Sequence, residues 1–277
     1  MDRGSQRADE AHELLKHALH GKWPRANSAA DIRENLRAVQ ARIEAACLRA
    51  DRDPADVRLL PVSKTMDATT VRHAWEAGCR TFGENKVQEA YGKWRETQDL
   101  GGVRWAVIGH LQTNKAKLVA EFASEFQALD SLRVARALED RLQALGRGLD
   151  VYVQVNTSGE ASKYGLAADD VVPFVNELQA YSSLRVRGLM TLAVFSAEET
   201  RVRACFASLR AVRDRLRNVS SANEGITELS MGMSGDFEIA IEEGATIVRV
   251  GQAIFGARAL PDSHYWPGID GGDDAPT

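Results

Sequence analysis

The chain has 277 residues, of which 44% are hydrophobic and 27% are charged, and its formal net charge is −4. These values are ordinary for a globular protein of one large or two small domains. A mildly acidic chain has no general attraction for nucleic acid or for anionic lipid, so we expect neither a nucleic acid nor a membrane as its partner.

The three cysteines, Cys47, Cys79 and Cys205, lack the paired spacing of disulfides or zinc sites. They predict free thiols in a reducing compartment, and we expect no bound metal. The sequence is charged from Asp2 onward and shows no signal peptide, and no apolar run is long enough to span a bilayer. We therefore expect a cytoplasmic protein.

The sequence is interpreted as three regions. Residues 1–26 form a flexible or helical N-terminal extension, residues 27–260 form one domain, and residues 261–277 form a disordered acidic tail. Proline and glycine mark loops within the middle region, and no long linker divides it. We therefore predict a single folded domain.

The domain begins with a helix over residues 27–48, because apolar residues recur at helical spacing between Ile32 and Ile43 and Ser28 can cap the first turn. Strand-like runs and helix-length amphipathic stretches then alternate to the end of the domain. The predicted strands are Val57–Ser63, Arg80–Gly83, Arg104–Gly109, Glu125–Leu129, Asp150–Asn156, Leu184–Met190, Thr227–Met231 and Thr246–Val250. The predicted helices are Ala68–Gly78, Lys86–Thr97, Thr113–Ala120, Ser131–Leu145, Ala168–Ala180, Glu198–Arg217 and Asp236–Glu243.

About eight strand-plus-helix units in this length are typical of a TIM barrel, which needs roughly 200 to 250 residues. A doubly wound open sheet is the alternative. The regularity of the units, and the lack of a glycine-rich dinucleotide loop after the first strand, favour the closed barrel. The predicted fold class is therefore α/β, with a single (β/α)8 barrel.

Lys64 ends the first predicted strand, after the run Arg58-Leu-Leu-Pro-Val-Ser. A lysine at the carboxyl end of a buried parallel strand points into the mouth of a barrel, where α/β folds place their chemistry. Desolvation lowers the pKa of such an amine and prepares it as a nucleophile toward an aldehyde or ketone. The local pattern alone favours a simpler interpretation, in which Lys64 caps the strand and extends to solvent.

The residues at the other strand ends favour the functional interpretation of Lys64 over the simpler one. Taken singly, the residues there are consistent with helix caps and turns, but together they place unusual side chains at one end of the predicted barrel, which indicates a site. These strand ends are Gly83–Asn85, Gly109–His110, Asn156, Met190, Ser230–Asp236 and Arg249–Gly251.

The loops after the seventh and eighth strands are the most specific of these. The run Ser230-Met-Gly-Met-Ser-Gly-Asp236 offers a hydroxyl and exposed backbone amides, and Arg249, Gly251 and Gln252 add a positive charge and further amides. Barrels often bind phosphate between these two loops. A phosphate site and a Schiff-base lysine in one barrel predict pyridoxal 5′-phosphate, with its aldehyde at Lys64 and its phosphate at Ser234.

These motifs together resemble those of the YggS/PROSC family of pyridoxal phosphate homeostasis proteins, whose barrel is similar to the N-terminal domain of alanine racemase. The resemblance covers Leu60 to Arg258. The matching runs are Val62-Ser-Lys64-Thr65, Phe82-Gly-Glu-Asn-Lys-Val-Gln-Glu89, Ile108-Gly-His-Leu-Gln-Thr-Asn-Lys115, Val155-Asn-Thr-Ser158, Lys163-Tyr-Gly165-Leu166, Gly188-Leu-Met190, Ser230-Met-Gly-Met-Ser-Gly-Asp236 and Val248-Arg-Val-Gly-Gln-Ala-Ile-Phe-Gly256.

The resemblance implies roles for individual residues. Lys64 would carry the cofactor, Ser234 with the Gly251 and Gln252 amides would bind its phosphate, and Arg249 would lie near the pyridine ring. The remaining expected cofactor-binding residues are Asn85, His110, Asn156, Met190, Ser230 and Met233. Lys86 and Gln252 occupy positions that the family varies, and nothing in the resemblance explains the extension or the tail.

Two functions from different classes fit this pattern. One is a protein that binds, buffers or delivers pyridoxal 5′-phosphate without significant catalysis, as a monomer that transiently meets apo-enzymes. The alternative is a pyridoxal-phosphate-dependent amino-acid racemase or a related fold-type III enzyme. A racemase needs a second base, which in alanine racemase is a tyrosine from an extra domain of the partner subunit. Few residues follow Phe255, and the five tyrosines lie in no motif that would present one to the cofactor.

An arginine against the pyridine nitrogen also weakens the ring as an electron sink, but alanine racemase resembles that arrangement. The missing second base therefore decides the prediction in favour of a binding protein. A class I aldolase that uses Lys64 against a sugar phosphate is a third interpretation. It differs in that the purified protein would lack the visible absorbance of bound cofactor.

Overall fold

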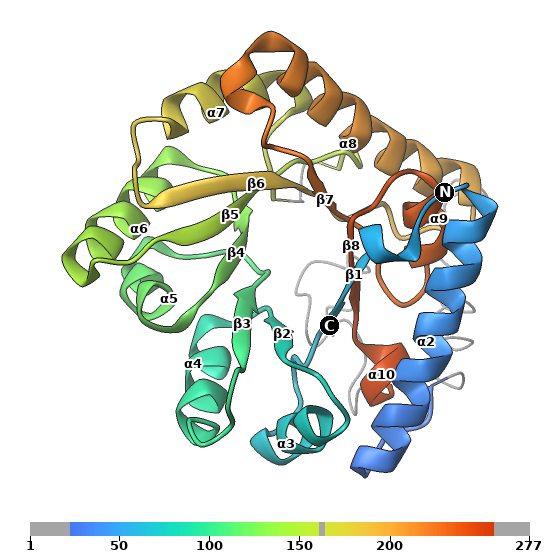
Figure 1. The fold of residues 1–277 in the computed structure, drawn as a ribbon. Coiled ribbons are helices and arrows are strands. Elements are labelled where there is room, and N and C mark those ends of the chain that lie inside the picture. The colour runs from blue at the N-terminus through green and yellow to red at the C-terminus, as the bar shows by residue number, and fades with distance from the viewer. Residues whose placement is uncertain (1–22, 161–163, 258–277) are drawn as a thin grey trace, which may run out of the picture.

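The computed structural model describes residues 23–160 and 164–257, and it contains the predicted barrel. Eight parallel strands follow one another in the order β1-β8-β7-β6-β5-β4-β3-β2, and a parallel bridge between Val62 and Gly83 joins the two ends of the series. Figure 1 shows the resulting nearly closed ring of strands with helices around it. The strands are β1 (Arg58–Pro61), β2 (Thr81–Glu84), β3 (Arg104–Val107), β4 (Glu125–Leu129), β5 (Leu149–Gln154), β6 (Leu184–Met190), β7 (Glu228–Ser230) and β8 (Ile247–Val250).

Three helices of the outer layer, α2, α3 and α6, begin at side chains that cap them. Ser28 accepts a hydrogen bond from the Asp31 amide at the start of α2, and Asp67 and Ser131 cap α3 and α6 in the same way. The helices are α2 (Ala29–Arg49), α3 (Ala68–Glu76), α4 (Val87–Glu96), α5 (Ala116–Phe122), α6 (Leu132–Leu145), α7 (Val171–Leu178), α8 (Glu199–Val219), α9 (Phe237–Glu242) and α10 (Gln252–Phe255).

Most predicted elements are confirmed, with differences at their ends. The predicted bounds of β4 and β6 agree with the structure residue for residue, and most other predicted strands extend one to three residues too far. The helix predicted from Thr113 begins as a 3-10 turn before α5, and the one predicted from Ala168 does so before α7. In both cases no side chain caps the first turn, so an α-helical start gains no added stabilisation there.

α2 completes the ring of helices on the outside of the barrel. It packs against α9 and α10, beside the strands β8 and β1 (Figure 1). Arg42 on α2 forms a two-fold hydrogen-bonded ion pair with Glu238 on α9, at 2.8 Å for each contact. Because α10 has only four residues, the helix that precedes the first strand covers the place where a TIM barrel normally has its last helix.

Residues 23–26, which fall within the predicted N-terminal extension, pack against the end of the barrel. The amide of Ala26 donates to the carbonyl of Phe255 at 3.2 Å, and the amide of Ala257 donates to the carbonyl of Trp23 at 2.8 Å. Gly256 lies between them with a φ of 95°, and a Cβ there would lie 2.4 Å from the Cα of Arg25. Only glycine permits this close approach, which ties the start of the described chain to its end.

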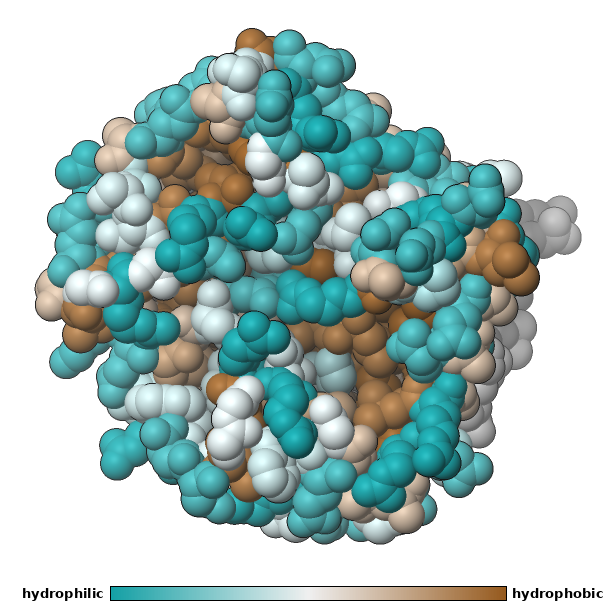
Figure 2. Space-filling view, viewed as in Figure 1, coloured by the Kyte–Doolittle hydropathy of each residue, from teal (hydrophilic) through white to brown (hydrophobic). Residues whose placement is uncertain are grey.

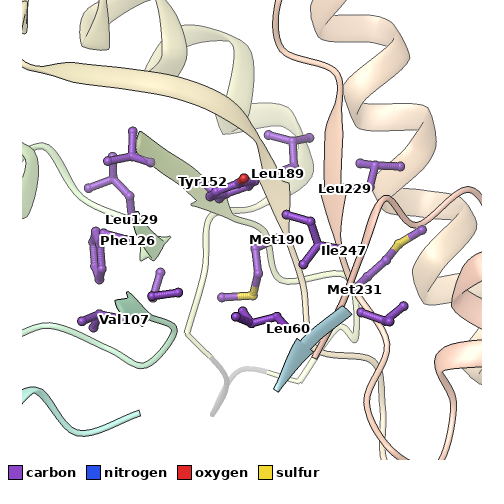
Figure 3. Packing of buried hydrophobic residues seen from close by; sticks show 14 of the residues in the cluster. Leu60, Val107, Phe126, Leu129, Tyr152, Leu189, Met190, Leu229, Met231 and Ile247 are labelled. Carbon is purple, nitrogen blue, oxygen red and sulfur yellow. The ribbon is translucent and has the colours of Figure 1, made fainter. Parts of the chain in front are cut away.

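Side chains from the strands contribute to one buried hydrophobic cluster, part of which Figure 3 shows. Parallel strands that are covered by helices are buried on both faces, which explains why they are nearly continuous apolar runs in the sequence. The labelled members of this cluster are Leu60, Val107, Phe126, Leu129, Tyr152, Leu189, Met190, Leu229, Met231 and Ile247, and each is at most 2% exposed.

Polar residues cover most of the outer rim of the face in Figure 2, and hydrophobic residues are visible in the recesses inside that rim. Among the described residues, no helix is long and apolar enough to cross a membrane. Two of the predicted regions lie wholly or mostly outside the described residues, as do two of the residues singled out in the sequence. These are residues 1–22 of the extension, the acidic tail 261–277, Lys163 and Tyr265.

Candidate active site at the carboxyl ends of the strands

Lys64 lies, as predicted, directly beyond the carboxyl end of β1. It is the second residue of a tight turn, which is closed by a hydrogen bond of 3.0 Å from the Met66 amide to the Ser63 carbonyl. The next residue, Thr65, has a φ of 69°. Turns with a positive φ at this position favour glycine, and a β-branched residue there is strained. The backbone after Lys64 therefore needs support from its surroundings.

That support comes from a buried polar cluster of Glu84, Glu89 and Lys93. The Lys93 ammonium group donates to the Ser63 carbonyl and to Glu84 at 2.8 Å each, and to Glu89 at 2.6 Å. Glu89 also accepts the Thr65 amide at 2.6 Å. Lys93 is only 5% exposed, which is unusual for a lysine and requires paired charges of this kind.

Glu84 is the most deeply buried acid of the cluster. Its Oε1 accepts from Lys93 and, at 2.6 Å, from the Ser63 hydroxyl, whereas its Oε2 has no hydrogen-bond partner among the described residues. Burial raises the pKa of Glu84 to about 7, and the hydrogen bonds from Lys93 and Ser63 only partly oppose this effect. A carboxyl group that titrates near neutral pH therefore lies directly behind the Lys64 turn.

Asn85 and His110 lie next to each other, as expected for the ends of neighbouring strands. The Ile108 amide donates to the Glu84 carbonyl at 2.9 Å, and a Cβ on Gly109 would lie 2.3 Å from the Asn85 carbonyl oxygen. Glycine at position 109 is thus required for the two loops to approach. The Asn85 side chain has no hydrogen-bond partner within the described ranges, so it is available to a ligand.

His110 is stacked on Tyr164, with ring centroids 4.0 Å apart and an interplanar angle of 13°. Its Nδ1 lies 3.7 Å from a carboxylate oxygen of Asp130. Burial raises the pKa of Asp130, and the neighbouring His110 acts in the opposite direction. This contact brings a tyrosine from the loop after β5 to the mouth of the barrel, which the sequence analysis did not anticipate.

Asn156 is also at the carboxyl end of its strand, but its side chain is used within its own loop. It donates to the Glu160 carbonyl at 2.9 Å and accepts from the Ser158 amide at 3.2 Å and hydroxyl at 3.0 Å. This arrangement is typical of an asparagine that organises a turn. Asn156 therefore shapes the loop that leads to Tyr164.

Arg249 and Ser230 lie in the barrel interior, below the mouth. One Arg249 nitrogen donates to the Ser230 hydroxyl at 2.8 Å and another to the Thr191 carbonyl at 2.7 Å, and Ser230 donates to Gln127 at 2.7 Å. Arg249 is 3% exposed, and this burial lowers the pKa of its guanidinium group to about 10, so it stays charged at neutral pH.

Met190, another predicted site residue, is 1% exposed and lies in the hydrophobic cluster of the barrel interior (Figure 3). Its neighbour along the chain, Thr191, accepts the hydrogen bond from Arg249. The end of β6 therefore forms part of the floor below the mouth.

Ser234 and Gly251 bring the two predicted phosphate loops together. The Ser234 hydroxyl accepts from the Ala253 amide at 3.3 Å, and a Cβ on Gly251 would lie 3.0 Å from the Val62 carbonyl. Val62 is two residues before Lys64, so the loop of Gly251 adjoins the Lys64 turn. The Ala253 amide joins this loop to the loop of Ser234. This juxtaposition is the central feature of the site.

The predicted phosphate loop is shaped by an acid, Asp236, which was not selected from the sequence. Its carboxylate accepts from the Met233 amide at 2.5 Å. Burial raises the pKa of Asp236, while the Met233 amide and the charge of Arg249 act in the opposite direction. The opposite charges of Asp236 and Arg249 thus stabilise each other at this end of β7 and β8.

The residues present fit a ligand that carries an aldehyde and a phosphate. The backbone amides of Ser234 and Gly235 donate no hydrogen bond within the described chain, and neither does the Gln252 side chain, so donors face the loop unused. Amides, a hydroxyl and a nearby guanidinium group form a donor set suited to a phosphate, and a lysine is the partner of an aldehyde.

The residues that the sequence analysis missed left partial signals. Lys93 is three residues after Ala90 and six after Val87, and therefore lies on the buried face of α4. Its spacing from Glu89 is that of a helical ion pair. A charged residue on an apolar helical face would have identified the cluster, whereas the hydrogen bonds of Gln127 and Thr191 depend on the barrel geometry alone.

Comparison with known proteins agrees with this geometry. Residues 28–259 match the family described as alanine racemase, N-terminal domain. A relative from Pseudomonas aeruginosa, named pyridoxal phosphate homeostasis protein, is 45% identical over 227 residues, which are 82% of this chain and 96% of the relative. A protein of the same name from Escherichia coli K12 is 40% identical over 82% of this chain and 97% of its own length.

Solved structures show the same fold. PipY of Synechococcus elongatus, solved with pyridoxal phosphate bound, superposes with a TM-score of 0.71 and is 35% identical, over 81% of this chain and 100% of that one. An alanine racemase of Clostridium difficile is only 14% identical, with a TM-score of 0.66 over 84% of this chain and 58% of that one, and it supports the fold alone. The chain belongs to the family of pyridoxal phosphate homeostasis proteins, which is built on the barrel of the alanine racemase N-terminal domain.

Proposed function

We propose that this protein binds pyridoxal 5′-phosphate as a Schiff base on Lys64 and holds it for release, as part of intracellular cofactor homeostasis. The observation that carries the proposal is the contact between Gly251 and Val62, which places the loop of Ser234 beside the Lys64 turn. The aldehyde and the phosphate of one small molecule can thus be bound together. The names of the relatives, and the cofactor bound to PipY, support the same assignment.

The Schiff base suits a carrier because it forms and breaks without any change in oxidation state. The Lys64 amine adds to the aldehyde carbon, the aldehyde oxygen leaves as water, and a carbon–nitrogen double bond remains. Water or a second amine reverses the linkage. We propose that apo-enzymes receive the cofactor from a monomer in this way through transient encounters.

We assign the phosphate to Ser234, its neighbouring amides and the loop from Gly251 to Ala253. A phosphate bound there would accept the unused donors of that loop, and the positive charge of Arg249 lies nearby in the interior. Asn85 and His110 line the opposite side of the mouth. The cofactor would therefore lie across the mouth, with its reactive end toward β1 and its charged end toward β7 and β8.

We further propose that the bound cofactor supports no significant turnover of amino acids. The cofactor supplies an electron sink to enzymes that use it, and that sink is strongest when the ring nitrogen is protonated. Arg249 does not transfer a proton to the ring nitrogen, because its guanidinium group retains its own proton near pH 7. Burial lowers its pKa only to about 10. The site therefore suits cofactor binding better than catalysis.

Replacing Ser234 with alanine is expected to weaken binding of pyridoxal 5′-phosphate by about tenfold or more, because the loss of a hydrogen bond to a charged group costs roughly 1.5–3 kcal/mol. Fluorescence or absorbance titration measures the dissociation constant. Ser220→Ala is the matched control, since Ser220 caps a 3-10 turn after α8 through its bond to the Ala222 amide and has no place in the site. Pyridoxal, which lacks the phosphate, should bind far more weakly than the phosphate ester, and equal affinity would exclude the phosphate assignment.

Incubation of the loaded protein with L- or D-alanine in deuterated water is expected to give no α-proton exchange at enzyme-like rates. Mass spectrometry or proton NMR measures the exchange. Tyr164 is the residue to test if exchange is observed, because its stacking on His110 makes it the tyrosine at the mouth that could donate a proton. Rapid exchange that is lost in both Lys64→Ala and Tyr164→Phe would establish a racemase-like enzyme in place of a binding protein.

A further inference from the structure

The peptide groups on both sides of Lys64 are bound by one buried cluster. The carbonyl before Lys64, on Ser63, accepts from the Lys93 ammonium group, and the amide after it, on Thr65, donates to Glu89. Glu89 and Lys93 are themselves joined at 2.6 Å. Because a peptide group is planar, fixing the planes on both sides of a residue fixes its φ and ψ angles and hence the direction of its side chain.

From this arrangement we propose that Lys93, acting with Glu84 and Glu89, is a positioning residue that aims the Lys64 amine toward the cofactor. This inference rests on the proposed Schiff base at Lys64 and assigns to it a support that lies outside the site. The Lys93 ammonium group acts through Ser63, Glu84 and Glu89 and needs no contact with the cofactor.

The chemistry of the cluster is matched to this role. A lysine ammonium group has three N–H donors, and Lys93 uses them on Ser63, Glu84 and Glu89. No donor is left for a ligand, so Lys93 is unsuited to act as a second nucleophile. Its three partners come from the β1 end, from β2 and from α4, and the ammonium group therefore joins three elements at one point.

The cluster stabilises a strained backbone conformation at Thr65. Threonine with a φ of 69° is held in a conformation that it rarely adopts. Strain of this kind persists only where the surroundings determine the backbone, and it is concentrated at functional sites. The Glu89 carboxylate holds the backbone in this conformation by accepting a hydrogen bond of 2.6 Å from the Thr65 amide. Without it the turn would relax and move the Lys64 side chain.

The first test is Lys93→Met, which keeps the length and apolar stem of the side chain and removes its three donors. The full-length variant is titrated with pyridoxal 5′-phosphate, the Schiff base is followed by its visible absorbance, and borohydride reduction with peptide mapping identifies the modified lysine. We expect the rate of formation and the affinity each to fall by about tenfold or more. Leu209→Ala is the control, because it opens a cavity under α8 in the outer layer and lowers stability without touching the cluster.

Glu89 provides a second pair of variants that is independent of a buried charge, since its side chain is 27% exposed. Glu89→Gln retains an oxygen that can accept from the Thr65 amide, whereas Glu89→Ala does not. We expect Glu89→Ala to slow Schiff-base formation at Lys64 and Glu89→Gln to retain most of the wild-type rate. If the role of Glu89 were purely structural, the rates of Schiff-base formation of the two variants would follow their stabilities. Thermal unfolding measures these stabilities in parallel.

The outcomes separate the two proposals. If the wild-type protein gives no borohydride-stable adduct at Lys64, the proposed function itself is wrong. If the wild type forms that adduct and Lys93→Met and Glu89→Ala form it at the wild-type rate and affinity, only the positioning role is wrong. The positioning role would also be wrong if Lys93→Met and Leu209→Ala lowered the rate of Schiff-base formation equally and Glu89→Ala and Glu89→Gln formed the Schiff base at the same rate.

Discussion

Replacing Lys64 with alanine is expected to abolish both the visible absorbance of the bound cofactor and its trapping by borohydride. The reason is that the turn after β1 presents this one amine beside the loop of Ser234, through the contact between Gly251 and Val62. Some non-covalent affinity should remain, because the phosphate donors lie on other strands. Absorbance spectra before and after reduction, followed by peptide mapping, measure the effect.

Two lysines that follow neighbouring strands serve as matched controls. Lys86 precedes α4 and Lys115 ends the 3-10 turn after β3, so both come from loops at the same end of the barrel. Lys86→Ala and Lys115→Ala should keep the absorbance band and the trapped adduct. Label found on Lys86, Lys115 or Lys163 in the wild-type protein would show that the cofactor lysine has been misassigned.

Glu84 is expected to make the folded protein less stable as the pH rises from about 4.5 to about 7. Burial raises the pKa of this carboxyl group from an ordinary value of 4.5 to about 7, so within this window the folded state binds more protons than the unfolded state does. Stability then decreases with rising pH, by on the order of 3 kcal/mol for a shift of this size, and is level above the folded pKa.

The measurement is the free energy of unfolding in urea at several pH values for the wild type and for Glu84→Gln. The variant lacks the titrating group, so its stability relative to the wild type should increase across the window. Glu96→Gln is the control, because Glu96 is an exposed glutamate at the end of α4, the helix that follows Glu84. Parallel curves for the wild type and Glu84→Gln would show that Glu84 does not titrate in this range. Asp130 and Asp236, whose pKa values are also raised, are present in both proteins and cancel in the comparison.

The fold could be predicted from the sequence because its signals are local. The apolar runs of parallel strands and the amphipathic period of the helices mark the alternation directly, and capping residues such as Ser28 and Ser131 mark helix starts. The short α10 and the role of α2 as the remaining helix of the outer ring could not be predicted in this way. Both depend on how β8 and β1 meet in space.

The candidate site was predictable in outline and not in its connections. Strand ends identify Lys64, Asn85, His110 and Ser234, because parallel strands bring all carboxyl ends to one side. The sequence does not show that Ser230 and Arg249 bind each other below the mouth, or that Asn156 is engaged within its own loop. These hydrogen bonds depend on which loops and strands come close together, and that proximity arises only in the folded barrel.

The contact between Val62 and Gly251 has a consequence for how the protein is made. These residues lie near the first and last strands, so Lys64 and the loop proposed to bind the phosphate come from opposite ends of the barrel sequence. A contact of such long sequence separation has a loop-closure entropy cost that must be met before the contact can stabilise the fold. A chain still emerging from the ribosome would carry Lys64 early but would complete the site only when β8 is released. Binding of the cofactor at the proposed site would thus require the finished barrel and would stabilise the contact between its two ends.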